Sequence, residues 1–454
     1  MKNLINQLKQ ANVMAKRRSE WKKKTNNFSE FYVKKRSLDE IVRENIEKNF
    51  DEFYSPSNGH FKGFFYIRDF WWVVDSLKKL GYEDYAKKTL NFVLNQYQKH
   101  KKITTTVTKD DVFDYPNYGM DSLPCLIDSI RILDYKLSDF QVKFIKKELD
   151  KYYKNIENKM VTPKKHFSNL SDHKIRRSST YSNSMYYLLL KALDELNEKY
   201  GYGLKLKDNP EEVKNAILSR LYNKKEGYFY DDIQKKPFVS GDAQIFPFRV
   251  GMIDDVEMFK KAIKNIYKNK LNEKLALRYH NPELFQNYNI FEHLKNVITN
   301  PKNQPQYHFS SLLCHEYQTD PYWGLLGINY LDALMKMHQK THDDFIFNEL
   351  KKETIRWKEL IEKYGDMFEL YQENKDRKKI RFIYEKDHNE YEIKEEIPEL
   401  IPFKTSTYFA DDGMIWQAKI LEAYNYIKNY DSNIDNDVKQ KKYENTIIVK
   451  KAQK

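Results

Sequence analysis

Apolar residues recur at helical spacing along most of the chain, and the helical stretches come in pairs. The first member of a pair is apolar nearly all round, as in the run Phe70–Val74. The second member carries a single apolar stripe and many charges. A helix that is apolar on every side is buried on every side, whereas a helix with one stripe covers a surface. The pattern therefore predicts an inner and an outer layer of helices.

Five such pairs and one further apolar helix can be placed on the chain. The pairs are 66–80 with 83–99, 118–133 with 138–155, 179–200 with 210–222, 241–252 with 254–269, and 321–339 with 343–364. The sixth apolar helix is expected over 408–426. The amphipathic helix 37–54, which opens with Ser37 and Glu40 as a capping box, is expected to complete the outer layer.

Six inner and six outer helices predict an all-α fold, the (α/α)6 toroid barrel. An open solenoid of helical pairs is the alternative, but it favours regular short loops, and the connections in this chain are long and uneven. Alternating apolar residues in Ile380–Tyr384 and Tyr391–Ile393 predict a small β-hairpin insertion near 378–396. The expected organisation is a basic N-terminal extension over 1–36, the barrel over 37–430, and a polar basic C-terminal tail over 431–454.

Composition supports the helical prediction. The 454 residues include only 13 glycines and 13 prolines, about half their usual share, and 15% of the residues are aromatic. Many short strands need frequent turn residues, and disordered chains have few aromatic ones, so neither alternative fits.

The charge balance adds little about partners. The formal net charge is +13, and part of the excess lies near the two termini. Basic and aromatic residues do not interleave as in known nucleic-acid-binding modules, so we expect no nucleic-acid partner. No apolar run has the length of a membrane span, and no signal peptide is visible. We therefore expect a soluble, cytoplasmic protein with no membrane partner; its oligomeric state is not predicted.

Candidate chemistry gathers in the loops that precede the inner helices. These loops combine carboxylates, amides, arginines and aromatic rings, and in a toroid all six open at the same end. Sugars need this mixture, because their C–H faces stack on Trp and Tyr while their hydroxyls bond to Asp, Asn and Arg. An Asp here is also a favoured helix N-cap, so the prediction of a carbohydrate site depends on the recurrence. The candidate substrate-binding residues are Tyr66, Arg68, Asp69, Trp71, Tyr118, Asp121, His166, Arg177, Tyr181, Asn183, Asp242, Gln244, Gln318, Tyr322, Trp323, Glu373, Asp411 and Asp412.

Several motifs, taken in order, resemble the six-hairpin glycosidases, a superfamily that includes glucoamylases, trehalases and processing α-glucosidases. Tyr66–Trp71 resembles the Arg-Asp motif of their first hairpin, and Lys225–Asp231 resembles the turn before their fourth inner helix. Pro321–Tyr330 and Asp411–Trp416 resemble two later segments. The resemblance covers roughly residues 60 to 425.

The resemblance implies an inverting glycoside hydrolase. Such enzymes use two carboxyl groups about 6.5–9.5 Å apart, one to protonate the leaving oxygen and one to activate water. By position, Asp172 would be the general acid and Glu369 the general base, with Glu373 as the second candidate for the base. This sequence departs from the superfamily in lacking a tryptophan beside Asp172, and in having Asp412 where a glutamate is usual.

Other functions remain open at this point. A sugar isomerase or epimerase on the same fold would need a histidine base, and the candidates are His166, His173, His308 and His315. A non-catalytic carbohydrate-binding protein is another alternative, and the basic residues of 166–177 could hold an anion. No cluster has metal-ligand spacing, so neither a metal nor a cofactor is expected.

Overall fold

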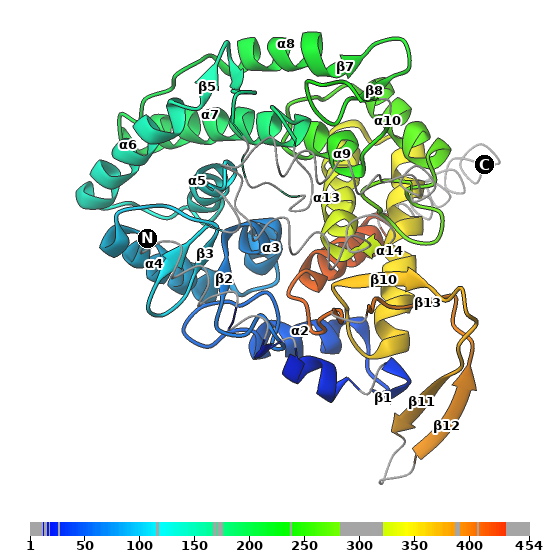
Figure 1. The fold of residues 1–454 in the computed structure, drawn as a ribbon. Coiled ribbons are helices and arrows are strands. Elements are labelled where there is room, and N and C mark those ends of the chain that lie inside the picture. Colours follow the sequence, from blue (N-terminus) through cyan, green and yellow to red (C-terminus); the bar gives the residue numbers. More distant parts are fainter. Residues whose placement is uncertain are drawn as a thin grey trace, which may run out of the picture.

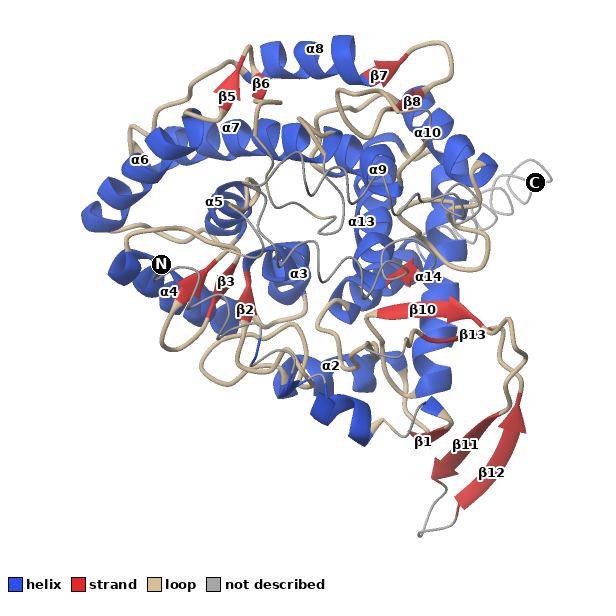
Figure 2. Cartoon of the chain, viewed as in Figure 1, coloured by secondary structure: helices blue, strands red, loops and turns tan. Residues whose placement is uncertain are grey.

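The computed structural model describes residues 12, 16–17, 19–25, 28–114, 118–165, 167, 170, 176–236, 238–281, 321–385, 391–405 and 408–432. Most of these residues are helical, and the strands form small sheets, one of which extends away from the helices (Figures 1 and 2). Among the described residues, no helix is both long enough and apolar enough to cross a lipid bilayer.

Six largely buried helices form a closed circuit of neighbours. They are α3 (Ile67–Lys79), α5 (Ser122–Ile132), α7 (Thr180–Tyr200), α9 (Gly241–Arg249), α13 (Gly324–Thr341) and a last helix over 417–432. The first five contact one another in that order. The last helix lies between α13 and α3, because Lys419 donates to Asp332 of α13 and Ser76 of α3 donates to Glu422. Figure 1 shows these helices around a common centre.

A second set of helices lies outside the first. Its members are α4 (Glu83–His100), α6 (Asp139–Tyr153), α8 (Pro210–Leu221), α10 (Val256–Lys268) and α14 (Asp344–Tyr364), and each contacts the inner helix before it. In α10 the buried residues are Phe259, Ala262, Ile263 and Ile266, a single stripe at helical spacing. In α9, by contrast, every residue is buried. The predicted division into all-round and one-sided helices is confirmed.

Helix α2 (Leu38–Lys48) supplies a further outer helix. It starts at the predicted capping box, in which the Ser37 hydroxyl accepts from the Glu40 amide and the Glu40 carboxylate accepts from the Ser37 amide. The helix packs against α14, and Asn49 at its end donates to the Gly413 carbonyl, in the loop before helix 417–432.

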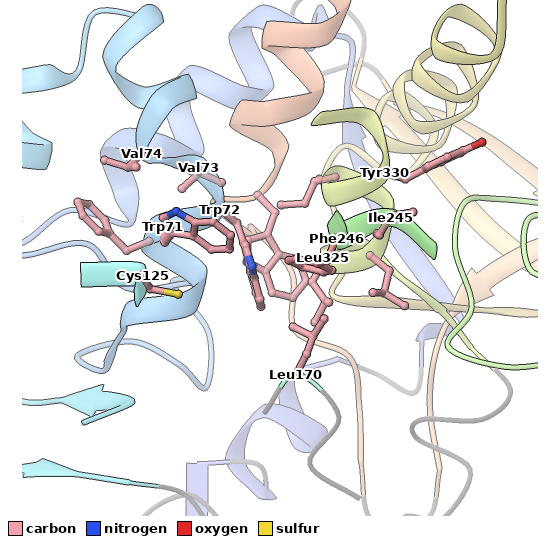
Figure 3. Packing of buried hydrophobic residues seen from close by; sticks show 14 of the residues in the cluster. Trp71, Trp72, Val73, Val74, Cys125, Leu170, Ile245, Phe246, Leu325 and Tyr330 are labelled. Atoms are coloured by element: carbon pink, nitrogen blue, oxygen red, sulfur yellow. The ribbon is translucent and has the colours of Figure 1, made fainter. Parts of the chain in front are cut away.

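The interior of the circuit is filled by large apolar side chains. Figure 3 shows Trp71 and Trp72 of α3 beside Phe246 of α9 and Leu325 of α13. The rings of Trp71 and Phe246 are stacked with centroids 6.5 Å apart. Long-range packing of this kind holds the inner helices together across the centre.

The predicted hairpin is present, and it pairs with a strand that the sequence did not lead us to expect. Strands β11 (Ile380–Glu385) and β12 (Tyr391–Glu396) are antiparallel, and β1 (Glu30–Lys34) pairs in parallel with β11. Strand β1 lies within the segment expected to be a basic extension. Its alternate residues Phe31 and Val33 are buried, so part of that segment belongs to the core.

Short strands connect the loops that precede the inner helices. Strands β2 (Phe65–Tyr66), β3 (Thr106–Val107) and β4 (Val112–Phe113) form one sheet, and β2 leads directly into α3. Strand β10 (Leu370–Glu373) lies between β9 (Tyr322–Trp323) and β13 (Leu400–Pro402), and β9 leads directly into α13. The antiparallel pairs β5 (Ile156–Glu157) with β6 (Met160–Val161), and β7 (Tyr222–Asn223) with β8 (Tyr228–Phe229), follow outer helices.

Two helix starts were predicted too early. The second inner helix begins at Ser122 rather than near 118, and the last begins at 417 rather than 408. Phe409, Ala410 and Met414 are buried, and their spacing in the sequence resembles the apolar face of a helix. Their stretch of backbone bonds to other segments instead, since the Ala410 amide donates to Phe403 and the Asp411 carbonyl accepts from the Glu369 amide.

Candidate active site

The backbone of Glu369 is held on both sides at the start of β10. Its amide donates to the Asp411 carbonyl at 2.8 Å, and its carbonyl accepts from the amide of Gly324, the first residue of α13, at 2.9 Å. Glu369 is therefore fixed between the fifth inner helix and the loop that leads to the sixth. The residue is buried, with 3% of its surface exposed.

The side chain of Glu369 accepts a hydrogen bond from the hydroxyl of Tyr408, which is also buried. Two further carboxyl groups, those of Asp69 and Asp411, lie near enough for the charge of Glu369 to raise their pKa values. Three of the predicted site residues, from three separate parts of the chain, thus gather at one place.

Asp69 lies in the first turn of α3, where it accepts a hydrogen bond of 3.0 Å from the Trp416 indole nitrogen. Burial raises the pKa of Asp69 to about 7, and the charge of Glu369 acts in the same direction. The indole bonds to one oxygen of the carboxyl group, and a carboxylate can accept further hydrogen bonds.

Asp411 accepts hydrogen bonds from a turn that includes Ser57 and Phe61, which were not among the predicted site residues. The Ser57 hydroxyl and the Phe61 amide both donate to Oδ2 of Asp411, and Nδ1 of His60 lies 3.5 Å from the same oxygen. A Cβ atom at Gly59 would lie 1.8 Å from Oδ1 of Asp411, so the turn requires glycine there. Burial raises the pKa of Asp411 well above its ordinary value, helped by Asp412 and Glu369. The sequence signal was the turn-forming run Ser55–Gly59 just before the first inner helix.

A second group of predicted residues meets where α3, α5 and α7 begin. Nε of Arg68 and the hydroxyl of Tyr181 both donate to Oδ2 of Asp121, at 2.6 and 2.8 Å. Arg68 and Asp69 are adjacent in sequence. The cluster of Arg68, Asp121 and Tyr181 therefore lies next to the carboxylate cluster that includes Asp69 and Glu369.

Glu373 has a different environment from Glu369. It accepts hydrogen bonds from the Arg278 guanidinium and from the Tyr322 hydroxyl. Burial raises the pKa of Glu373, but the hydrogen bond and charge of Arg278 outweigh that effect, and the net pKa is lowered. Glu373 is thus an anion paired with Arg278.

Four predicted residues use their polar groups within the protein. Asp242 accepts from Arg176 at 2.6 Å, and Gln244 both accepts from and donates to the Phe229 backbone. Asn183 accepts from the Val161 amide and donates to the Ser179 carbonyl. The Trp71 indole donates to Asp128, and the Arg249 guanidinium lies 3.8 Å from its ring centroid. These contacts fix the framework around the inner helices.

The aromatic candidates differ in burial. Trp323 is buried and meets the Tyr279 ring edge-on, with centroids 5.4 Å apart. Tyr66 and Tyr118 are partly exposed, and Tyr118 packs against Phe167. Tyr66 packs against Phe61 and Phe64. The Arg177 side chain is exposed, and its backbone amide donates to Asp232.

Asp412 contributes to a neighbouring acidic pair. Burial raises its pKa, and burial together with the charge of Asp412 raises the pKa of Asp366. Asn45 of α2 donates to Asp366 at 2.9 Å. The adjacent residues Asp411 and Asp412 therefore belong to different clusters. Asp411 lies near Glu369, and Asp412 lies near Asp366 and α2.

Several predictions fall outside the described residues. These are the proposed general acid Asp172, the binding candidates His166 and Gln318, and His173, His308 and His315, the other histidine candidates for an isomerase base. Within the described ranges, no group of His, Cys, Asp and Glu side chains could hold a metal ion.

The sequence matches neither a protein family nor a curated protein, but several solved structures share its fold. A wild-type glycosidase has a TM-score of 0.55 at 10% identity, over 86% of this chain and 97% of its own. A glycosidase variant in complex with glucose gives 0.53 at 11% identity, with the same coverage. A rhamnosidase from Klebsiella oxytoca with rhamnose bound gives 0.53 at 11% identity, over 87% of this chain. This chain matches 63% of the rhamnosidase. At these identities the likeness is one of fold.

Proposed function

We propose that this protein is an inverting glycoside hydrolase whose active site lies at the loop end of an (α/α)6 toroid. The observation that carries the proposal is the placement of Glu369. It is fixed by its backbone between the start of α13 and the loop that leads to helix 417–432, bonded to Tyr408, and close to Asp69 and Asp411. The fold shared with glycosidase structures and the six-hairpin motifs of the sequence support the same reading.

In the proposed reaction Glu369 is the general base. It takes a proton from water as the water oxygen bonds to the anomeric carbon, on the face opposite the leaving group. Asp172 gives its proton to the leaving oxygen as the glycosidic bond breaks. Tyr408 holds the Glu369 carboxylate in position by donating its hydroxyl proton. Because water enters opposite the leaving group, the anomeric configuration inverts.

The substrate-binding part of the proposal centres on Asp69 and Arg68. Asp69 is held by the Trp416 indole, and its carboxyl group would accept from a sugar hydroxyl. Arg68 is fixed by Asp121, which itself accepts from Tyr181. The partly exposed rings of Tyr66 and Tyr118 supply faces for sugar C–H groups. This arrangement fits a neutral carbohydrate substrate.

A screen of aryl glycosides and disaccharides, read by anomer-resolved NMR, tests the proposal. We expect hydrolysis of at least one glycoside with inverted configuration in the first product, and its loss in Asp172→Asn. Retained configuration would contradict the water-activating role of Glu369. A ring-opened isomer with no hydrolysis would instead identify a sugar isomerase.

A further inference from the structure

The sheet formed by β1, β11 and β12 extends away from the helical ring, as Figures 1 and 2 show. Its order is β1-β11-β12, so β12 forms an outer edge. In the part of the chain that the structure describes, β12 pairs with β11 alone. The other edge of β12 therefore presents backbone donors and acceptors that another strand can meet.

One face of this sheet carries an apolar row that runs to the open edge. Tyr32, Ile383 and Ile393 are direct cross-strand neighbours. Tyr32 is 71% exposed and Ile393 is 52% exposed, so the two ends of the row face solvent. The opposite face carries Phe31 and Phe382, which are buried against the body of the protein.

Edge strands usually carry charges that discourage further pairing. Four of the six residues of β12 are charged, and the two that flank Ile393 have opposite signs, Glu392 on one side and Lys394 on the other. Two copies of such a strand are complementary when they pair antiparallel, because Lys394 of each strand can then lie opposite Glu392 of the other.

The register of such self-pairing is restricted. A two-fold axis perpendicular to the sheet keeps the apolar face on one side, so one residue of the strand must lie on the axis opposite its own copy. The axes that give the longest overlap of β12 pass through Ile393 or Lys394. An axis at Lys394 sets two lysines against each other and Glu392 against the partner's Glu396, whereas like charges directly opposite each other are destabilising.

We propose that β12 pairs antiparallel with β12 of a second copy of this chain, with Ile393 on the two-fold axis. The two Ile393 side chains then meet, and the apolar row continues across both sheets. Lys394 lies opposite the partner's Glu392, and the symmetry repeats this pair. A single strand pair buries less surface than most stable interfaces, so the dimer dissociates on dilution.

Sedimentation velocity of the full chain over a wide range of protein concentration tests this proposal. We expect a monomer–dimer equilibrium for the wild type and a monomer for Ile393→Lys, which sets two charges together on the axis. Ile355→Lys changes another exposed isoleucine, on α14, and should leave the dimer intact. A wild type that stays monomeric at every concentration, or a dimer that survives Ile393→Lys, would overturn the proposal.

A charge exchange tests the register itself. Lys394→Glu places like charges opposite each other twice and should raise the dimer dissociation constant by about tenfold. Adding Glu392→Lys to that variant restores opposite charges in the register centred on Ile393, so dimerisation should return. Circular dichroism shows whether each variant is folded. Failure of the double variant to dimerise, while folded, would rule out this register.

Discussion

Asp69 shows how a candidate binding residue affects stability through its protonation. Burial raises its pKa to about 7, whereas an aspartate in an unfolded chain has a pKa of about 3.9. Between these values the folded chain binds the proton more tightly than the unfolded chain, so stability falls as the pH rises from about 4 to about 7.

Asp69→Asn should reduce that pH dependence. The asparagine oxygen can still accept from Trp416 but does not ionise, so we expect the melting temperature to fall less between pH 5 and pH 8 than in the wild type. Asp110→Asn, in an exposed turn, is the control and should follow the wild-type curve. Differential scanning calorimetry across this pH range makes the comparison. A curve for Asp69→Asn parallel to the wild type would contradict the raised pKa.

At the residue scale, the sequence indicated which polar residues are present near the site but not which partner each one contacts. Asp69, Glu369 and Asp411 were all selected, and the structure brings them together. Gln244 was selected on the same grounds, yet its amide satisfies the Phe229 backbone. His60 was not selected, because its contact with Asp411 joins positions that are far apart in the chain. Local patterns show which groups are present, and only the fold shows which partners they meet.

Helix 417–432 is joined to its neighbours by buried charges as well as apolar packing. Lys419 donates to Asp332 of α13 at 3.1 Å and to Glu422 at 2.7 Å, and Glu422 also accepts from Ser76 of α3. Lys419 is buried, so these bonds form where water cannot replace them. The sixth inner helix is thereby tied to both of its neighbours.

Lys419→Met should therefore destabilise the protein by on the order of 3 kcal/mol, because it leaves buried carboxylates with fewer donors. Urea unfolding measures the change. Lys428→Met on the exposed side of the same helix is the matched control, and a change within about 0.5 kcal/mol is expected there. Equal effects of the two substitutions would show that the buried charges do not join the helices.

The capping box of α2 provides a second test at this scale. Ser37→Ala removes the acceptor for the Glu40 amide and should lower the free energy of unfolding by about 1 kcal/mol. Ser37→Thr keeps a hydroxyl acceptor and should recover most of the loss. If the two variants were equally destabilised in urea unfolding, the cap would not explain the start of this helix.

The alternation of inner and outer helices was predictable, since burial on all sides leaves a clear mark in sequence. Strand β1 was not, because its pairing partner β11 lies about 350 residues away and only Phe31 and Val33 hint at a buried face. The start of the last helix was also missed. The apolar residues before that helix are buried, but their backbone is extended and forms hydrogen bonds with Phe403 and Glu369 instead of helical ones.

On the scale of the whole molecule, closing the inner helices into a circuit brings distant loops together. Asp69 follows β2, Glu369 directly precedes β10, and Asp411 precedes the last helix, yet the charge of Glu369 acts on the other two carboxyl groups. An open solenoid would leave the first and last helices apart. The contacts of helix 417–432 with both α13 and α3 favour a closed circuit over that alternative.

The most direct test of the account compares Glu369→Gln with Glu373→Gln on a glycoside that the wild type hydrolyses. Removal of a general base should lower kcat by about 10²–10⁴-fold, with the melting temperature within a few degrees of the wild type. Glu373 is already paired with Arg278, so Glu373→Gln should retain most of the activity. A Glu369→Gln enzyme that still hydrolyses the glycoside at the wild-type rate would contradict the proposed role of Glu369.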